Sequence, residues 1–163
     1  MRRNRQRRGF SLIELLIVIT IITILATMAV PKLMKFRMSG NETAAISAIG
    51  TLHTAEASYN STYGRFAQNL TELGPPASGN DSAASSGLIS ADLAKGEKQG
   101  YKFTLTGNGA GYTISAVPIT YNSTGSRTFY SDQGMDIHEN HGQEPATASS
   151  PLIGAVAKTG DSK

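Results

Sequence analysis

A single carboxylate, Glu14, interrupts an otherwise apolar run near the start of the chain. The run extends from Phe10 to Val30 and contains no other charge, no glycine and no proline. A charged side chain near the centre of a membrane span costs about 2.5–3.5 kcal/mol on insertion scales, so such a residue marks a functional site by default. The chemistry open to Glu14 is pairing with a positive group that is buried beside it.

The element that carries Glu14 is predicted to be a helix that crosses a membrane. At about 1.5 Å per residue, the run from Phe10 to Val30 gives a helix of about 31 Å, enough to span the hydrocarbon core. Five arginines precede the run and predict a cytoplasmic N-terminus: Arg2, Arg3, Arg5, Arg7 and Arg8. A secretory signal peptide cleaved after Ala29 and an ordinary single-pass anchor are the two alternatives, and neither accounts for Glu14 shortly after Gly9-Phe10.

The residues around Glu14 form a recognisable motif, Gly9-Phe10-Ser11-Leu12-Ile13-Glu14-Leu15-Leu16. This motif resembles the N-terminal signal of type IV pilins and type II secretion pseudopilins. The resemblance implies that a prepilin peptidase cuts between Gly9 and Phe10 and methylates the new amino group of Phe10. It also implies that Pro31 occupies the position where many members of the family carry a proline, which we expect to kink the helix. The remainder of the chain carries no comparably specific motif.

The resemblance further implies a role for Glu14 in assembly. Subunits of this family stack with their N-terminal helices in a fibre core, where the amino group of Phe10 and the carboxylate of Glu14 from neighbouring subunits would be buried as a pair. Neither charge is tolerated alone in a medium of low dielectric constant.

The expected function is that of a major-pilin-like structural subunit of a type IV pilus. The alternatives are a type II secretion pseudopilin in a short periplasmic pseudopilus, and a minor pilin that binds DNA or a surface. The implied partners are further copies of the chain in a helical homopolymer, the prepilin peptidase, an inner-membrane assembly platform with its ATPase, and a secretin where an outer membrane is present. The implied location is the bacterial inner membrane as a single-pass protein, followed by the surface pilus or the periplasmic pseudopilus.

Composition excludes several other classes of protein. The net charge of +3 includes the five leader arginines, and without them 10 Lys and Arg oppose 12 Asp and Glu. The positive charge of the chain is therefore explained by the orientation of the membrane span, and we do not expect nucleic-acid binding. The chain has no cysteine, which excludes disulfides and cysteine-ligated zinc. No nucleotide-binding loop or catalytic triad pattern occurs, so we expect neither an enzyme nor a cofactor.

The predicted fold is α+β, the pilin fold, with a long N-terminal helix whose second half packs on a small antiparallel sheet of three to four strands. Alternating residues flank a glycine-rich turn at 107–111 and predict a hairpin. The segment Ser39-Gly40-Asn41-Glu42 is either a local break or a restart of the helix. The predicted organisation is a leader at 1–9, the membrane and fibre-core helix at 10–31, an amphipathic helix at 32–60, a variable connecting loop at 61–100, the sheet at 101–141 and a flexible tail at 142–163.

Candidate ligands in the globular part are few. Asp132, Asp136 and Glu139 supply oxygen atoms either for calcium or for capping a turn, and their spacing does not fit an EF-hand. His53 is predicted to be a surface or interface histidine rather than a metal ligand.

Overall fold

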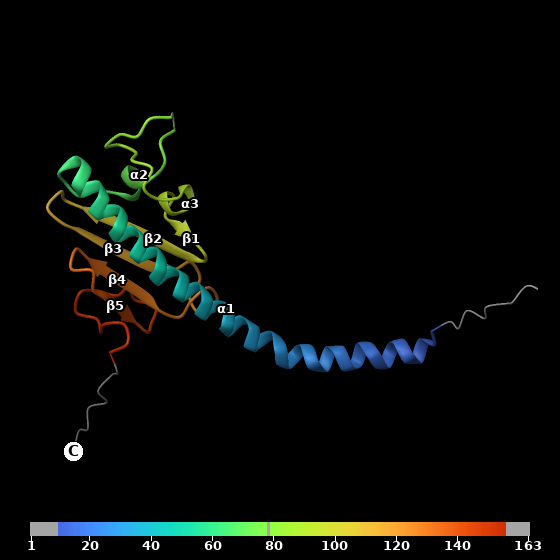
Figure 1. Cartoon of the computed structure of the whole chain (residues 1–163). Coiled ribbons are helices and arrows are strands. Elements are labelled where there is room, and N and C mark those ends of the chain that lie inside the picture. Colours follow the sequence, from blue (N-terminus) through green and yellow to red (C-terminus); the bar gives the residue numbers. More distant parts are fainter. Residues whose placement is uncertain (1–9, 78, 156–163) are drawn as a thin grey trace, which may run out of the picture. The chain divides into compact units, whose positions relative to one another are not determined.

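The computed structural model describes residues 10–77 and 79–155. Its first element is one helix, α1 (Leu12–Tyr63), which is unbroken at Pro31 and at Gly40 (Figure 1). The segment around Gly40, expected to break or restart the helix, is therefore continuous helix. The chain divides into two compact units between Phe36 and Arg37, so α1 contributes its first half to one unit and its second half to the other.

A five-stranded antiparallel sheet follows α1, and its strand order is the order of the sequence (Figure 1). Its strands are β1 (Glu97–Lys98), β2 (Tyr101–Gly107), β3 (Tyr112–Pro118), β4 (Thr128–Asp132) and β5 (Ile137–Asn140). The hairpin is formed by β2 and β3, with Phe103 opposite Ala116 and Gly107 opposite Tyr112. The predicted α+β pilin fold is confirmed. The expected number of strands was one too low, because two-residue β1 has no detectable alternation.

The second half of α1 packs one face on this sheet and forms the core of the globular unit (Figure 1). Residues of this face recur at intervals of three and four, as one stripe of a helix requires. They include Ala45, Ile49, Leu52 and Tyr59, all buried. From the sheet, β2 contributes alternate buried residues, as expected for a strand with one face on the core.

The segment 61–100, expected to be a connecting loop outside the core, contributes to the core instead. It contains α2 (Leu70–Leu73), α3 (Ala91–Ala94) and β1. Its buried apolar side chains are Ala67, Leu70, Leu73, Ile89 and Leu93. The Asn69 side chain caps α2 by accepting from the backbone N–H groups of Thr71 and Glu72. The sequence from Asn69 to Leu73, ahead of Gly74, indicates a short turn of helix at α2. The four residues of α3 are too few for periodicity to reveal a helix.

The segment 142–155, expected to be part of a flexible tail, lies against β5. The N–H of Glu139 donates to the carbonyl of Pro151 at 2.8 Å, and the N–H of Ile153 donates to the carbonyl of Ile137 at 2.9 Å. Ala146 is buried. These bonds satisfy backbone groups of the outermost strand, which would otherwise be an open sheet edge. The remainder of the expected tail, 156–163, and the expected leader, 1–9, lie outside the described residues.

Candidate functional site

The first half of α1 exposes its large apolar side chains on every side. Leu12 is 82% exposed, and the exposure extends through Val30, which is 53% exposed. Burying one such side chain is worth about 1.5–3 kcal/mol, so a helix of this kind is stable only when lipid or another protein covers it. Within the described residues, α1 is long and apolar enough to cross a membrane. This half of the helix is therefore expected to be in contact with lipid or with another protein.

Glu14 lies in the first turn of α1, among these apolar side chains. Its position is favourable because the N-terminal end of a helix carries partial positive charge. Glu14 is exposed, and the ion pairs found among the described residues do not include it. The carboxylate is thus presented to whatever covers the helix.

The predicted processing site falls at the boundary of the described chain. Gly9 lies outside the described residues, whereas Phe10 is described and exposed. Phe10 precedes the first helical residue, Leu12, by two positions. The amino group that cleavage would create at Phe10 is therefore about one helical turn from Glu14 in the sequence.

Hydroxyl groups in the apolar half of α1 bond back to their own helix. Thr20 donates to the carbonyl of Leu16 at 2.8 Å, and Thr23 donates to the carbonyl of Ile19 at 2.7 Å. Thr27 donates to the carbonyl of Ile24 at 2.7 Å, one turn before Pro31, which has no N–H to donate. The polar atoms of the threonines are thereby satisfied without water, as a membrane environment requires. Whether Pro31 kinks the helix stays a prediction.

Two carboxylates and one guanidinium link the second half of α1 to the sheet. Arg127 Nε donates to Glu42 Oε2 at 2.9 Å, and Arg127 Nη1 donates to Glu139 Oε2 at 2.7 Å. Burial alone would raise the pKa of Glu42, but hydrogen bonds from the backbone and hydroxyl of Ser126 and from Arg127 lower it. Glu42 and Glu139 are both buried, so Arg127 neutralises charges that could not be left alone.

This ion-pair cluster uses one of the candidate calcium ligands. Glu139 contacts Arg127, while Asp132 Oδ1 accepts from the N–H of Gly134 at 2.8 Å and so caps a turn. Glu139, on β5, lies opposite Phe129 of β4, and Phe129 is three residues before Asp132 on that strand. Within the described ranges, no group of three His, Asp or Glu side chains could hold a metal ion. The structure thus does not bring Asp132, Asp136 and Glu139 together as a calcium site.

His53 is buried in the core, so the prediction of a surface or interface histidine is wrong. Its Nδ1 lies 2.7 Å from the Tyr112 hydroxyl and its Nε2 lies 2.9 Å from Ser131 Oγ. Ser131 donates its own hydroxyl proton to the carbonyl of Asp136 at 2.7 Å, so it accepts from His53 Nε2–H. Nδ1 of the neutral imidazole then accepts from Tyr112. Burial lowers the pKa of His53, and the charge of Asp132 partly opposes this shift.

Glu56 is a fully buried acid one turn further along α1. Its Oε2 accepts from the N–H of Ala67 at 2.9 Å, and its Oε1 has no hydrogen-bond partner within the described structure. Burial raises the pKa of Glu56 to about 7, an effect that the Ala67 bond opposes and the charge of Glu72 reinforces. Glu72 itself is held ionised by Arg65, which donates to it at 2.8 Å.

Sequence reasoning missed these buried polar residues. Glu42 and Glu56 lie on the same three-and-four spacing as the buried apolar residues Ala45, Ile49 and Leu52. Extending the apolar stripe of the helix to its charged members would have placed both acids against the sheet. Their partners could not be found in this way, because Arg127 and Ala67 both lie outside the helix, and Arg127 is 85 residues from Glu42.

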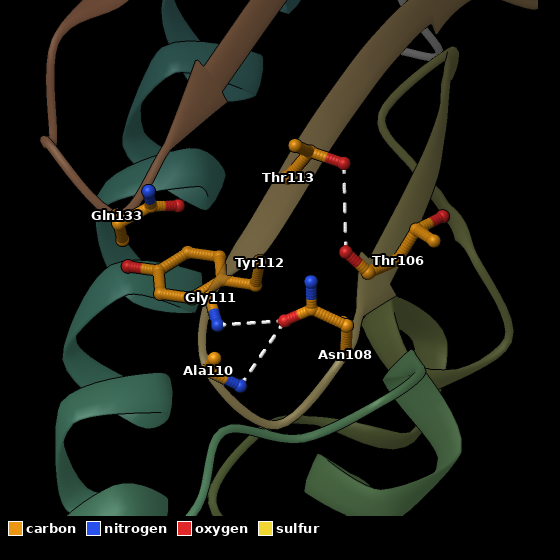
Figure 2. Close-up of a pocket in the computed structure, with 8 residues that line it drawn as sticks. Thr106, Asn108, Ala110, Gly111, Tyr112, Thr113 and Gln133 are labelled. Carbon is orange, nitrogen blue, oxygen red and sulfur yellow. Dashed lines mark hydrogen bonds between the residues drawn. The ribbon is translucent and has the colours of Figure 1, made fainter.

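A depression of about 430 Å³ lies between the β2–β3 turn and the residue after β4, Gln133 (Figure 2). The lining is polar and, apart from Tyr112, contains no ionisable side chain: Thr106, Gly107, Asn108, Ala110, Gly111, Tyr112, Thr113 and Gln133. Asn108 folds over the turn, and its Oδ1 accepts from the backbone N–H groups of Ala110 at 3.1 Å and Gly111 at 2.8 Å (Figure 2). The side chain of Asn108 thus orders the turn.

Comparison with known proteins gives two matches, and each covers less than half of the chain. Residues 4–30 match a family model described as the prokaryotic N-terminal methylation motif. Over 71 residues, the chain is 40% identical to the type IV major pilin protein PilA of Myxococcus xanthus (strain DK1622). That alignment covers 44% of this chain and 32% of the relative, so the chain matches about a third of the length of that protein. No solved structure shows a significant match.

Proposed function

We propose that the chain is a member of the type IV pilin family and the major-pilin-like structural subunit of a type IV pilus; the N-terminal methylation motif at residues 4–30 and the partial match to a type IV major pilin support this. The observation that carries this proposal is the first half of α1, an exposed apolar helix with a single carboxylate in its first turn. Such a helix serves two environments in turn, the lipid bilayer before assembly and the fibre core after it. The small globular unit that follows would form the outside of the fibre.

Processing is the first step of the proposed mechanism. The leader arginines hold the N-terminus in the cytoplasm, while the run from Phe10 to Val30 crosses the inner membrane. The prepilin peptidase cuts after Gly9 and methylates Phe10. The exposure of Phe10 and its place ahead of the first helical residue, Leu12, support this assignment, because a bond outside the helical ladder is accessible to a peptidase.

Assembly is the second step. The apolar helix passes from lipid into the core of a helical homopolymer, where the amino group of Phe10 pairs with Glu14 of a neighbouring subunit. The pairing removes two charges that are each costly in low dielectric, and it sets the axial register of the subunits. The assembly platform, its ATPase and, where an outer membrane is present, a secretin are the proposed partners.

The experiment that tests this proposal is mass spectrometry of the N-terminus of protein sheared from the cell surface. We expect a terminus at N-methylated Phe10 in sheared filaments. The same terminus found only in membrane or periplasmic fractions would contradict the surface pilus and favour a pseudopilin or a minor pilin. A terminus after Ala29 would mean an ordinary secreted protein.

Two variants separate processing from assembly. Gly9→Ala should leave an uncleaved precursor in the membrane. Glu14→Gln, which keeps the shape of the side chain and removes its charge, should insert into the membrane and yet yield few filaments. Ser11→Ala, between the two sites, is the matched control and should assemble normally. Filaments of Glu14→Gln at the wild-type level would refute the pairing of Glu14 with Phe10.

A further inference from the structure

The β2–β3 turn carries the sequence pair Asn108-Gly109, the one Asn–Gly pair in the chain. Asn108 is exposed, and its side chain folds over the turn toward the residues that follow it (Figure 2). The amide oxygen of Asn108 accepts two backbone N–H groups, from Ala110 at 3.1 Å and from Gly111 at 2.8 Å. These bonds hold the side-chain carbonyl beside its own backbone.

We propose that Asn108 is a site of self-modification, at which the backbone nitrogen of Gly109 displaces the side-chain amide. The bond that forms joins the Gly109 nitrogen to Cγ of Asn108, and the bond that breaks joins Cγ to Nδ2. The proton of the Gly109 N–H leaves with Nδ2 as ammonia, and a five-membered succinimide ring remains. Water then opens the ring at one of its two carbonyl groups and yields aspartate or isoaspartate. No oxidant or cofactor is required.

The turn supplies two features that favour this reaction. Negative charge develops on Oδ1 when the nitrogen attacks Cγ, and the N–H groups of Ala110 and Gly111 already point at that oxygen. Preorganised donors at a developing oxyanion are a large source of rate acceleration in acyl transfer. Gly109 has φ 82° and no side chain, so nothing shields its nitrogen. In the described part of the chain, that N–H donates none of the hydrogen bonds formed by the turn.

The product changes the surface of the hairpin. Aspartate at position 108 keeps both acceptor bonds, and these become stronger because the acceptor is charged. It places a carboxylate in a depression whose lining, apart from the Tyr112 phenol, has no ionisable side chain. Isoaspartate lengthens the backbone by one atom and disturbs the bond from the N–H of Asn108 to the carbonyl of Gly111, which is 3.1 Å long. Filament subunits would therefore acquire negative charge at this tip as they age.

The test uses the full chain in detergent micelles, incubated in mildly alkaline buffer with and without urea. Tryptic cleavage after Lys102 and Arg127 gives one peptide that contains both Asn108 and Asn122. Mass spectrometry follows replacement of an amide by an acid at each site, and chromatography separates the isoaspartate form. We expect Asn108 to convert in the folded chain while Asn122, which precedes a serine, stays intact.

A variant and the urea arm make the outcome decisive. Asn108→Gln keeps the amide but cannot form the five-membered ring, so it should lose the conversion while the chain stays folded. Conversion of Asn108 in urea alone would show that the turn protects the residue, and would overturn the proposal. Equal conversion of Asn108 and Asn122, or no conversion of Asn108 in the folded chain, would overturn it as well.

Discussion

Replacing Glu56 by glutamine should remove a large part of the dependence of folding stability on pH. In the folded chain Glu56 is fully buried, and one of its two oxygens has no hydrogen-bond partner in the described structure. Its pKa is raised from 4.5 to about 7, with burial as the main cause. Folding therefore favours the protonated acid. The resulting stability is fully present below the unfolded pKa and is lost as the pH rises through the folded value.

The size of the effect follows from these two pKa values. A difference of one pKa unit corresponds to 1.36 kcal/mol, so a rise from 4.5 to about 7 corresponds to about 3 kcal/mol of unfolding free energy. This is a large share of the 5–15 kcal/mol that is typical of a small domain. Glu56→Gln keeps an oxygen that can accept from the N–H of Ala67, but its amide does not titrate. The variant should therefore not show this loss of unfolding free energy as the pH rises.

The assay is urea unfolding of the full chain in micelles at several pH values, followed by tyrosine fluorescence because the chain has no tryptophan. The charged or titratable groups that interact with Glu56 are Arg65, Glu72 and Tyr112. His53 precedes Glu56 by three residues on α1 and also titrates. The effect of His53 on the pH dependence of stability has the opposite sign to that of Glu56. Its pKa is lowered, so its contribution is present above the unfolded pKa and is lost as the pH falls.

The informative quantity is therefore the difference between wild type and Glu56→Gln at each pH. We expect the wild type to lose stability relative to the variant between about pH 4.5 and pH 7. Glu72→Gln is the control, because the pKa of Glu72 is lowered and its contribution should instead be lost as the pH falls. Parallel curves for wild type and Glu56→Gln across this range would refute the argument from burial.

Three further changes test other parts of the structure. Arg127→Met leaves two buried carboxylates without a partner and should cost about 3–5 kcal/mol in urea unfolding, whereas Arg65→Met, at a more exposed pair, should cost at most about 1 kcal/mol. Equal losses would contradict the role given to Arg127. Tyr112→Phe removes the hydroxyl that donates to His53 and should cost about 1–3 kcal/mol in the same assay. Pro31→Ala restores an N–H inside α1 and should change the stiffness of filaments more than their processing; unchanged filament mechanics would argue against a kink at Pro31.

The fold and the N-terminal motif were accessible from local sequence patterns, and the polar contacts of the core were not. Alternation and a glycine-rich turn located β2 and β3, because each strand exposes one face and the turn needs residues without bulk. The pattern failed at β1 and α3, which are too short to show a period. It failed at His53 too, because a histidine on a helix is buried or exposed according to what faces it.

The sequence by itself determined the membrane-length apolar helix, the placed acid Glu14 and the leader pattern ending at Gly9, since these depend on neighbours along one chain. Length, charge and hydropathy act there without any tertiary contact. Only the tertiary structure decided that the pKa of Glu42 is lowered beside Arg127 while the pKa of Glu56 is raised to about 7. Both are glutamates on one stripe of one helix, and they differ in what the chain outside the helix brings to them: a guanidinium in one case and a single backbone N–H in the other. Electrostatic free energy in a buried site depends on such partners, which no local pattern contains.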